Sequence, residues 1–286
     1  MSIQTTIAGS VATLPPSLAR IARLVGDDPS TVVESTINEL AEECDTSVAS
    51  VVRFCRAIGF DGYAALRRAL ATELGRESAQ FSAHASFGSE IAVGDTLREA
   101  TAKVAGLESL AIEETVSGLD YEVLEAVVEA LDGAERILLF GVGASRLVAD
   151  DLGHKLLRVG RNAIVLSDSH EATASAAVRA APTAAVGFSQ SGSTIETVRF
   201  LEAARSAGAA TIGITGSSGS PLAQASDHTL FTHAREPRFR AGAMVSRIAQ
   251  LVLVDCIFLG VAQRRFDDTV DALQRTADAA RGLRSN

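Results

Sequence analysis

The segment TAAVGFSQSGSTIETV, residues 183–198, contains one complete unit of a recognisable fold type. Its first six residues are mostly apolar, the next six are small or polar and include a glycine, and the last residues begin a helical pattern. A short apolar run, a polar turn and then a helix form the repeating unit of parallel sheets with helices on their faces. The segment therefore predicts an α/β fold.

The same unit recurs on both sides of this segment. Further apolar runs are ILLF at 137–140, AIVL at 163–166 and TIGIT at 211–215, and small polar residues and a helical stretch follow each of them. Repeated strand-then-helix units predict a parallel sheet that is covered on both faces. Residues 96–133 have helical spacing instead, so we expect leading helices before the sheet.

The N-terminal part of the chain follows a different pattern. From Leu18 to about Leu74, apolar residues recur at intervals of three and four, and no segment alternates as a strand does. The intervening stretch 76–90 is polar, rich in Ser and Ala and without clear periodicity, which is typical of a linker. The sequence thus predicts an all-α domain at 1–77, a linker at 78–95 and a second domain at 96–286.

Composition and charge limit the classes of protein. With 286 residues, of which 47% are hydrophobic and 21% charged, the chain can bury a sizeable core. Its net charge of -9 excludes a protein coated in positive charge for non-specific nucleic-acid binding, but it allows a small local DNA-binding face.

The cysteines and the apolar stretches indicate a cytoplasmic protein. Cys44, Cys55 and Cys256 are scattered and lack the spacing of a zinc site or a disulfide framework. The most apolar stretch, residues 248–263, contains Asp255 and is better interpreted as a buried helix than as a membrane span. We expect no secretion signal, no membrane partner and no metal.

Residues 35–60, STINELAEECDTSVASVVRFCRAIGF, have the pattern of a helix-turn-helix. One helix is expected from Thr36 to Glu43 and a second from Ser47 to Ala57, with a break at Asp45-Thr46. Asp tolerates the left-handed conformation that such a turn needs, and Ser47 can cap the helix that follows.

The second of these helices is the candidate DNA-reading element. Its expected inward stripe is Val48, Val51, Val52 and Cys55. Its expected outer, DNA-binding residues are Ser47, Ala49, Ser50, Arg53 and Arg56. Small residues near a helix start allow close approach to a groove, and arginines can reach base edges or phosphates. Five arginines against two acidic residues between positions 46 and 76 agree with this hypothesis, although a solvated helical bundle fits the pattern equally well.

The stretch INELAEECDTSVASVVRFCRAIGFDGYAALRRAL, residues 37–70, resembles the N-terminal domain of the RpiR family of bacterial regulators. The resemblance covers roughly residues 17–75. In that domain a VVRFCR-like segment is followed by a Gly-aromatic pair and another helix. The family commonly has Gly-Val at the turn, where this chain has Asp45-Thr46. The resemblance implies a transcription regulator with a double-stranded DNA operator as partner.

Two loops of the second domain carry candidate binding chemistry. Gly141 to Ser145 follow one apolar run, but Arg146 stands where a dinucleotide fingerprint requires its third glycine, so no nicotinamide cofactor is expected. A tight turn capped by Ser145 is the simpler interpretation of that loop alone. The loop at 189–194, SQSGST, offers hydroxyl groups, an amide, a glycine and a helix start, which together can hold a phosphate without lysine or arginine. A capped turn explains it equally well.

Together, GVGAS at 141–145, SQSGST at 189–194, ITGSSGSPLAQASDHTL at 214–230 and EPRFRAGAMVSRIAQLVLVD at 236–255 resemble the sugar isomerase (SIS) domain of RpiR-type regulators, over about residues 120–265. The resemblance implies a phosphosugar effector. The implied effector-binding residues are Ser145, Ser189, Gln190, Ser191, Thr194 and Glu236. The common loop has an acidic residue where this chain has Ser193, and Glu236 has a salt bridge to a neighbouring arginine as its alternative role.

The sequence therefore predicts a non-enzymatic transcription regulator, a repressor of sugar metabolism genes that acts as a homodimer or tetramer. A phosphosugar aldose-ketose isomerase is the alternative, because some SIS domains are catalytic. That reaction requires a base near the sugar. The available candidates are His170, Glu171, His228, His233 and Glu236. A module that only dimerises the DNA-binding domain is a third hypothesis.

Overall fold

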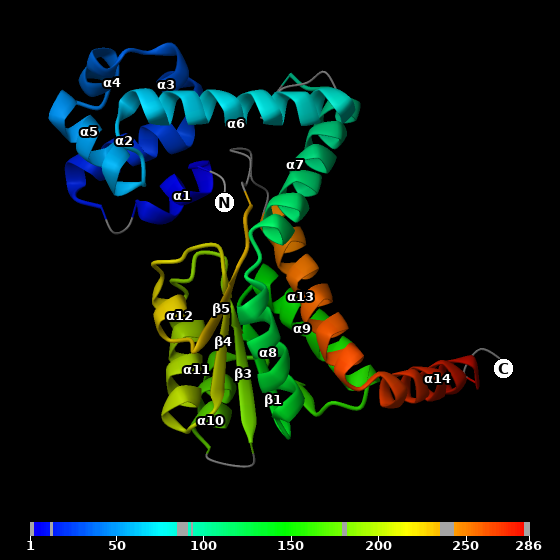
Figure 1. Cartoon of the computed structure of the whole chain (residues 1–286). Coiled ribbons are helices and arrows are strands. Elements are labelled where there is room, and N and C mark those ends of the chain that lie inside the picture. The colour runs from blue at the N-terminus through cyan, green and yellow to red at the C-terminus, as the bar shows by residue number, and fades with distance from the viewer. Residues whose placement is uncertain are drawn as a thin grey trace. The chain divides into compact units, whose positions relative to one another are not determined.

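The computed structural model describes residues 3–11, 14–84, 91–92, 94–178, 182–234 and 243–282 (Figure 1). The chain forms two compact units: the first comprises residues 1–110 and 233–241, and the second comprises residues 111–232 and 242–286. Each unit has a hydrophobic core of its own, so each is described separately.

The first unit is entirely helical in its described part, as the sequence predicted. Its helices are α1 (Ile3–Ser10), α2 (Pro16–Asp27), α3 (Ser30–Glu34), α4 (Ile37–Glu43), α5 (Val48–Ala57) and α6 (Tyr63–His84), followed by most of α7 (Leu97–Ser117). Ile21, Leu40, Phe54 and Leu66 are fully buried at its centre. The apolar residues recur at helical spacing because each of these helices contributes one face to this core.

Local hydrogen bonds define the helix-turn-helix. Thr36 and Glu39 form a capping box at the start of α4, in which each side chain accepts from the other residue's N–H group. Asp45 lies in the turn with φ 47°, the left-handed conformation expected for it. Ser47 then caps α5 by accepting from the N–H of Ser50. The predicted positions of both helices and of the turn are confirmed.

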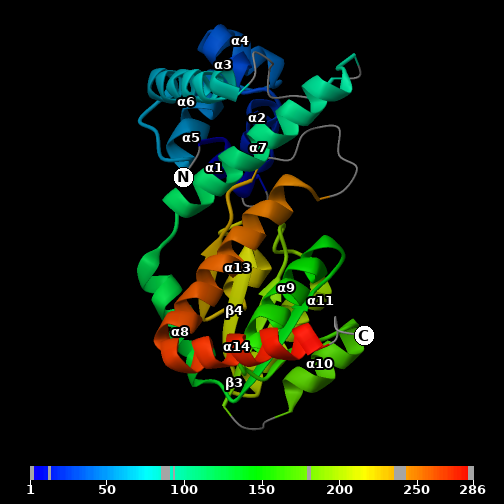
Figure 2. The same ribbon diagram turned by 90° about the vertical axis from the view of Figure 1, so that its right-hand side faces the viewer.

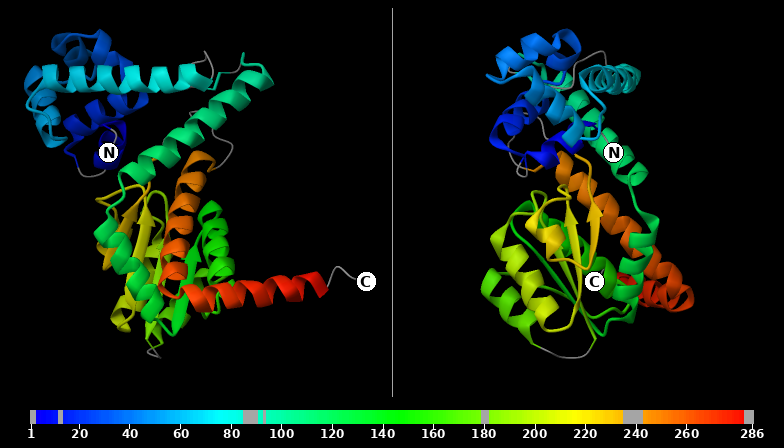
Figure 3. Two further views of the ribbon diagram at one scale, coloured as in Figure 1. Left: turned by 45° about the vertical axis from the view of Figure 1, so that its right-hand side comes forward. Right: turned by 60° about the vertical axis from the view of Figure 1, so that its left-hand side comes forward.

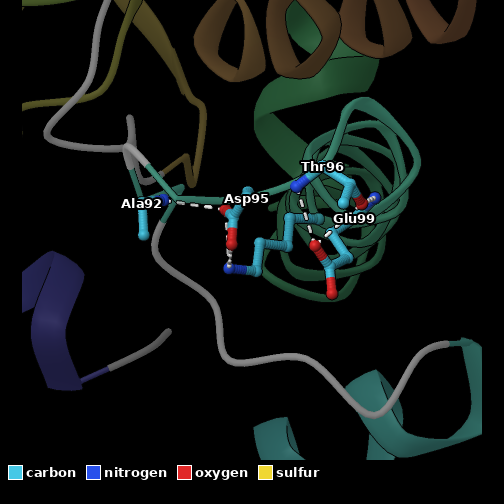
Figure 4. A network of polar contacts seen from close by, with 5 residues as sticks. Ala92, Asp95, Thr96 and Glu99 are labelled. Atoms are coloured by element: carbon cyan, nitrogen blue, oxygen red, sulfur yellow. Dashed lines mark hydrogen bonds and ion pairs between the residues drawn. The ribbon is translucent and has the colours of Figure 1, made fainter.

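The segment 78–95 differs from its expected irregular form at its first end, whereas residues 91–92 and 94–95 form no helix or strand, as expected. The helix α6 continues to His84, because Ala, Leu, Glu, Arg and Gln in its second half are good helix formers. At the other end, Thr96 and Glu99 form a capping box that begins α7, and Asp95 pairs with the buried Lys103 at 2.8 Å (Figure 4). The domain limits at 77 and 95 stay predictions.

The second unit contains the parallel sheet that the sequence predicted. Its elements after α7 are α8 (Tyr121–Gly133), β1 (Arg136–Gly141), α9 (Ala144–Arg158), β2 (Ala163–Val165), α10 (Ser169–Ala177), β3 (Thr183–Phe188), α11 (Ile195–Ser206), β4 (Ala210–Thr215), α12 (Pro221–Gln224), β5 (His228–Phe231), α13 (Val245–Arg264) and α14 (Phe266–Gly282). The strands pair in the order β2-β1-β3-β4-β5, and every pairing is parallel.

Helices cover both faces of this sheet. Residues of β1 alternate between the two faces: Ile137 and Leu139 pack with α8, α9 and α13, whereas Leu138 and Phe140 pack with α10, α11 and α12. Figure 2 views the first of these faces, and the right-hand view of Figure 3 brings the second toward the viewer. Strands that are buried on both sides explain why the sequence shows continuous apolar runs instead of alternation.

The long apolar helix α13 packs against α8 and α9, as expected for a buried helix. By length and composition it could also cross a membrane. Its apolar sequence contains the charged residue Asp255, however, and this residue forms an ion pair with Lys155 of α9. We therefore describe α13 as a core helix of this domain.

Candidate effector site and DNA-binding helix

The strand order places two loops side by side at one edge of the sheet. From β1 the chain crosses to β2 on one side, and from β3 it crosses to β4 on the other, so the connections diverge between β1 and β3. Open α/β sheets bind ligands at this switch point, outside the carboxyl ends of the strands. Gly141 and Phe188 are paired at these ends, so the loops that begin at Val142 and Ser189 are neighbours.

The loop from Ser189 to Thr194, here called the serine loop, is held by its own polar groups. Ser189 is only 3% exposed; its N–H donates to the carbonyl of Ile214, and its hydroxyl lies 2.9 Å from that of Thr194. Ser191 and Ser193 are exposed, with their hydroxyls 3.0 Å apart. Buried hydrogen bonds thus hold the start of the serine loop in place, while other hydroxyl groups of the loop face solvent.

Gln190 ties the serine loop to the loops after β4 and β5. Its carbonyl accepts from the N–H of Gly216 at 2.9 Å, and its side-chain oxygen accepts from the hydroxyl of Thr232 at 3.0 Å. A side chain on Gly216 would come within 2.3 Å of the Gln190 amide nitrogen, so this glycine makes room for the glutamine. The observed role of Gln190 is therefore to anchor the loop.

Gly192 is required by the geometry of the loop. Its φ of 65° is left-handed, and a Cβ there would lie 2.1 Å from the Ser220 hydroxyl oxygen. Both the conformation and the close approach exclude larger residues. The glycine therefore fixes the path of the chain immediately before α11.

The helices that begin at the switch point lack the side-chain caps of their neighbours. At α9 the N-cap is Gly143, and at α11 it is Thr194; neither makes a side-chain cap hydrogen bond. By contrast, Asp168 caps α10 and Ser220 caps α12. The first N–H groups of a helix have no partner within the helix and carry its partial positive charge. Two such uncapped helix starts thus follow adjacent strands.

Ser145 lies in the first turn of α9 and is half-buried. The interpretation of Ser145 as the cap of this helix is therefore wrong. The helix begins two residues earlier than such a cap would allow, at Ala144, because the left-handed Gly143, at φ 62°, makes the turn. Arg146, which was not among the predicted site residues, connects this loop to the next one by donating to the carbonyl of Ser167 at 2.8 Å.

Two of the candidate catalytic bases, Glu171 and His228, are poorly suited to proton transfer at the serine loop. The N–H and hydroxyl of Ser167 both donate to Glu171 and hold the pKa of that carboxyl below its ordinary value. His228 begins β5 and therefore lies at the amino edge of the sheet, opposite the serine loop. Glu236 lies outside the described residues.

On α5 the structure places four of the five predicted DNA-binding residues at the surface. Ser47, Ala49, Arg53 and Arg56 are exposed. Ser50 is not: it is 4% exposed, so its expected place on the outer surface is wrong. The inward stripe also differs from expectation, since Phe54 is fully buried whereas Val48 is 38% exposed. The large ring of Phe54 decides which side of the helix faces the core.

An arginine outside the motif holds the turn of the helix-turn-helix. Arg20 of α2 donates to the carbonyl of Cys44 at 3.1 Å and to that of Asp45 at 2.6 Å. These bonds stabilise carbonyl groups at the end of α4. Sequence reasoning missed Arg20 because nothing in the local pattern connects it to a turn 24 residues away.

Comparisons with known proteins agree with this geometry. The helix-turn-helix domain of the rpiR family matches residues 1–77, and the SIS domain matches residues 130–260. An HTH-type transcriptional regulator of Caldanaerobacter subterraneus subsp. tengcongensis is 38% identical over 263 residues, which cover 92% of this chain and 91% of that protein. The chain belongs to the RpiR family of helix-turn-helix transcription regulators.

Two further relatives support this membership. The HTH-type transcriptional regulator YbbH of Bacillus subtilis is 31% identical over 95% of this chain and 94% of its own length. The solved structure of the NanR protein of Vibrio vulnificus, complexed with ManNAc-6P, matches all of both chains with a TM-score of 0.64 and 27% identity. In this RpiR-family regulator, α4 and α5 form the helix-turn-helix, and β1 to β5 form the sheet of the SIS domain.

Within the described ranges, no three His, Cys, Asp or Glu side chains are grouped so that they could hold a metal ion. The polar groups gathered at the switch point are hydroxyls, an amide, backbone N–H groups and the guanidinium of Arg146. This donor set suits an anion with several oxygen atoms.

Proposed function

We propose that this RpiR-family regulator binds a phosphorylated sugar, whose phosphate lies between the first turns of α9 and α11. The observation that carries the proposal is the pair of uncapped helix starts at the switch point. Their N–H groups and partial positive charges attract an anion, and Arg146 in the first turn of α9 adds a positive charge beside them. The flanking helices α10 and α12 have their own caps and offer no equivalent site.

The serine loop supplies the remaining contacts in this proposal. Ser191 offers an exposed hydroxyl to the phosphate, and the half-buried Thr194 and Ser145 offer hydroxyls from the helix starts. Ser189 and Gln190 act mainly by holding the loop in place. Glu236 is assigned to the sugar by family resemblance alone. The ManNAc-6P bound to the similar NanR protein supports a sugar phosphate as the class of effector.

We assign the binding of operator DNA to α5. Ser47, Ala49, Arg53 and Arg56 contact the operator, and the effector shifts the equilibrium between arrangements of a homodimer or tetramer that bind DNA with different affinities. An effector can do this only through its different affinity for the two arrangements. We place the protein in the cytoplasm as a repressor of sugar metabolism genes.

Sensing is favoured over isomerisation because relatives that match more than nine-tenths of this chain are named transcriptional regulators, and the lowered pKa of one candidate base, Glu171, agrees with this. A carboxylate whose pKa is lowered by two hydrogen bonds from Ser167 is a weak base at neutral pH. Catalysis requires the opposite shift, toward the working pH. We therefore propose that the SIS domain of this chain binds its sugar without converting it.

Thermal unfolding with a panel of hexose and N-acetylhexosamine phosphates, each beside its unphosphorylated sugar, tests the effector. One phosphosugar should raise the unfolding temperature by about 5–10 °C at 100 times its Kd, and its unphosphorylated form should not. Ser191→Ala should weaken this response, whereas Ser206→Ala, at the far end of α11, should not. A panel without any stabilising member would refute the sensor, and turnover of a phosphosugar would establish the isomerase instead.

A further inference from the structure

A chain of hydrogen bonds links three side chains of α5 that are one turn apart. The hydroxyl oxygens of Ser47 and Ser50 are 3.1 Å apart, and Nη2 of Arg53 donates to the Ser50 oxygen at 3.2 Å. Residues three apart are neighbours on the surface of a helix, so these contacts follow one ridge of α5. The middle residue, Ser50, is buried, whereas the two outer residues are exposed.

Elimination fixes the direction of the bond to Arg53, whereas either hydroxyl can be the donor between Ser47 and Ser50. A guanidinium has only donors, so the Ser50 oxygen is the acceptor for Arg53. The Ser50 hydroxyl can then give its own proton to Ser47, which also accepts from the backbone N–H of Ser50. Arg53 uses one of its five N–H donors in this way and keeps four for other partners.

Burial makes this contact a stable one. Water competes poorly for the Ser50 hydroxyl, because the residue is only 4% exposed. A hydrogen bond to a charged donor is also stronger than one between neutral groups. The guanidinium is therefore held in one place on α5, although the Arg53 side chain is exposed.

We propose that Ser50 is a positioning residue for DNA recognition, whose buried hydroxyl orders the Arg53 guanidinium before DNA arrives. Arg53 touches the operator and Ser50 does not. A free arginine side chain loses rotamer freedom when it binds, and an arginine that is already ordered loses less. This inference rests on the proposed role of Arg53 at the DNA interface.

The test measures the Kd of the full-length protein for a duplex that the wild type has selected from a randomised library, at one fixed salt concentration. Ser50→Ala should raise the Kd about threefold to tenfold. Its unfolding temperature should not fall, because Ser47 still accepts from the backbone N–H of residue 50. Ser50→Thr keeps the hydroxyl and should restore most of the affinity. Ser206→Ala, in the other unit, is the matched control and should have no effect.

The Arg53→Ala background separates positioning from a purely structural role. There, Ser50→Ala should change the Kd by less than about twofold, because the side chain that it positions is gone. Equal losses in both backgrounds, or no loss in the wild-type background, would overturn the positioning role. An unchanged Kd for Arg53→Ala itself would show that neither residue takes part in DNA recognition. The proposed effector site is tested separately, by thermal unfolding with phosphosugars.

Discussion

The helices α5 and α11 start alike in sequence but differ in how their first turns are satisfied. Each follows a hydroxyl residue with extended backbone, Ser47 at α5 and Thr194 at α11. Ser47 caps its own helix, whereas the Thr194 hydroxyl makes no cap bond and pairs with that of Ser189. The comparison shows that the neighbouring residue, and not the cap residue alone, decides whether a helix start is closed or open to a ligand.

In the proposed function, the two starts also prepare the protein for phosphate in different ways. At α5 the charges for the DNA backbone come from the arginine side chains Arg53 and Arg56, and the helix start is closed. At α11 the attraction comes from the backbone N–H groups and the helix dipole. Charged side chains suit a long polyanion of variable shape, and the fixed backbone N–H groups at a helix start suit one small phosphate.

The largest effect is expected from Gly192→Ala, which forces the serine loop out of its path. The left-handed φ of 65° and the approach of 2.1 Å to the Ser220 hydroxyl oxygen should together lower the free energy of unfolding of the second domain by about 2–4 kcal/mol. Urea denaturation measures this. Gly208→Ala is the control, since Gly208 has φ 84° but nothing within 4 Å of an added Cβ. Equal losses at both glycines would contradict the close packing of the loop.

The next largest effect is expected from Thr194→Asp, which would give α11 the kind of cap that α10 has in Asp168. A carboxylate at this position competes with the phosphate and repels it, so the affinity for the stabilising phosphosugar should fall about 100-fold, equal to about 2.7 kcal/mol. Calorimetric titration measures the affinity. Ser206→Asp adds the same charge at the other end of α11 and should change little; an undiminished affinity in Thr194→Asp would place the phosphate elsewhere.

A smaller effect on stability distinguishes the capped start of α5 from the uncapped start of α11. Ser47→Ala should lower the free energy of unfolding of the first domain by about 1 kcal/mol, equally with and without the phosphosugar, because its cap bond is internal. Thr194→Ala should cost more in the presence of the phosphosugar than in its absence, because its hydroxyl meets the ligand. Denaturation of both variants under both conditions provides the comparison. A loss that is independent of ligand at Thr194 would make the two starts equivalent.

The smallest effect concerns pH and the closed start of α10. The N–H groups of Glu171 and His170 lower the pKa of Asp168, so its ionised cap stabilises the fold above the unfolded-state pKa of about 3.9. That contribution is lost as the pH falls through the lower pKa of the folded state. Asp168→Ala should therefore flatten the dependence of stability on pH in this acidic window, measured by urea denaturation at several pH values. An unchanged slope would exclude the cap.

The sequence predicts four strands of the sheet but misses one of its two edge strands, β5. The apolar runs at 137–140, 163–166, 183–188 and 211–215 correspond to β1 to β4. The fifth strand, His228–Phe231, has only four residues and begins with His and Thr, so no apolar run marks it. It is a strand because β4 offers it a pairing partner, and such a tertiary cause is not visible in a local pattern.

The sequence predicts where the candidate residues lie, but not which side chains are buried or which hydrogen bonds they make. Helical periodicity allows two adjacent inward stripes on α5, and only the packing of Phe54 selects between them, which turns Val48 outward and buries Ser50. Similarly, Ser47 and Thr194 are equivalent cap residues in sequence. Their different hydrogen-bond partners depend on how the folded chain places Ser50 and Ser189.

In the proposed function, the first turns of α9 and α11 hold the phosphate of an effector. Backbone amide chemical shifts of the ¹⁵N-labelled protein, recorded while the stabilising phosphosugar is added, test it directly. The account predicts that the largest shifts fall at residues 143–146 and 192–196, with smaller shifts at the capped starts of α10 and α12. Shifts that are largest at α10 or α12, or absent from both open starts, would contradict it.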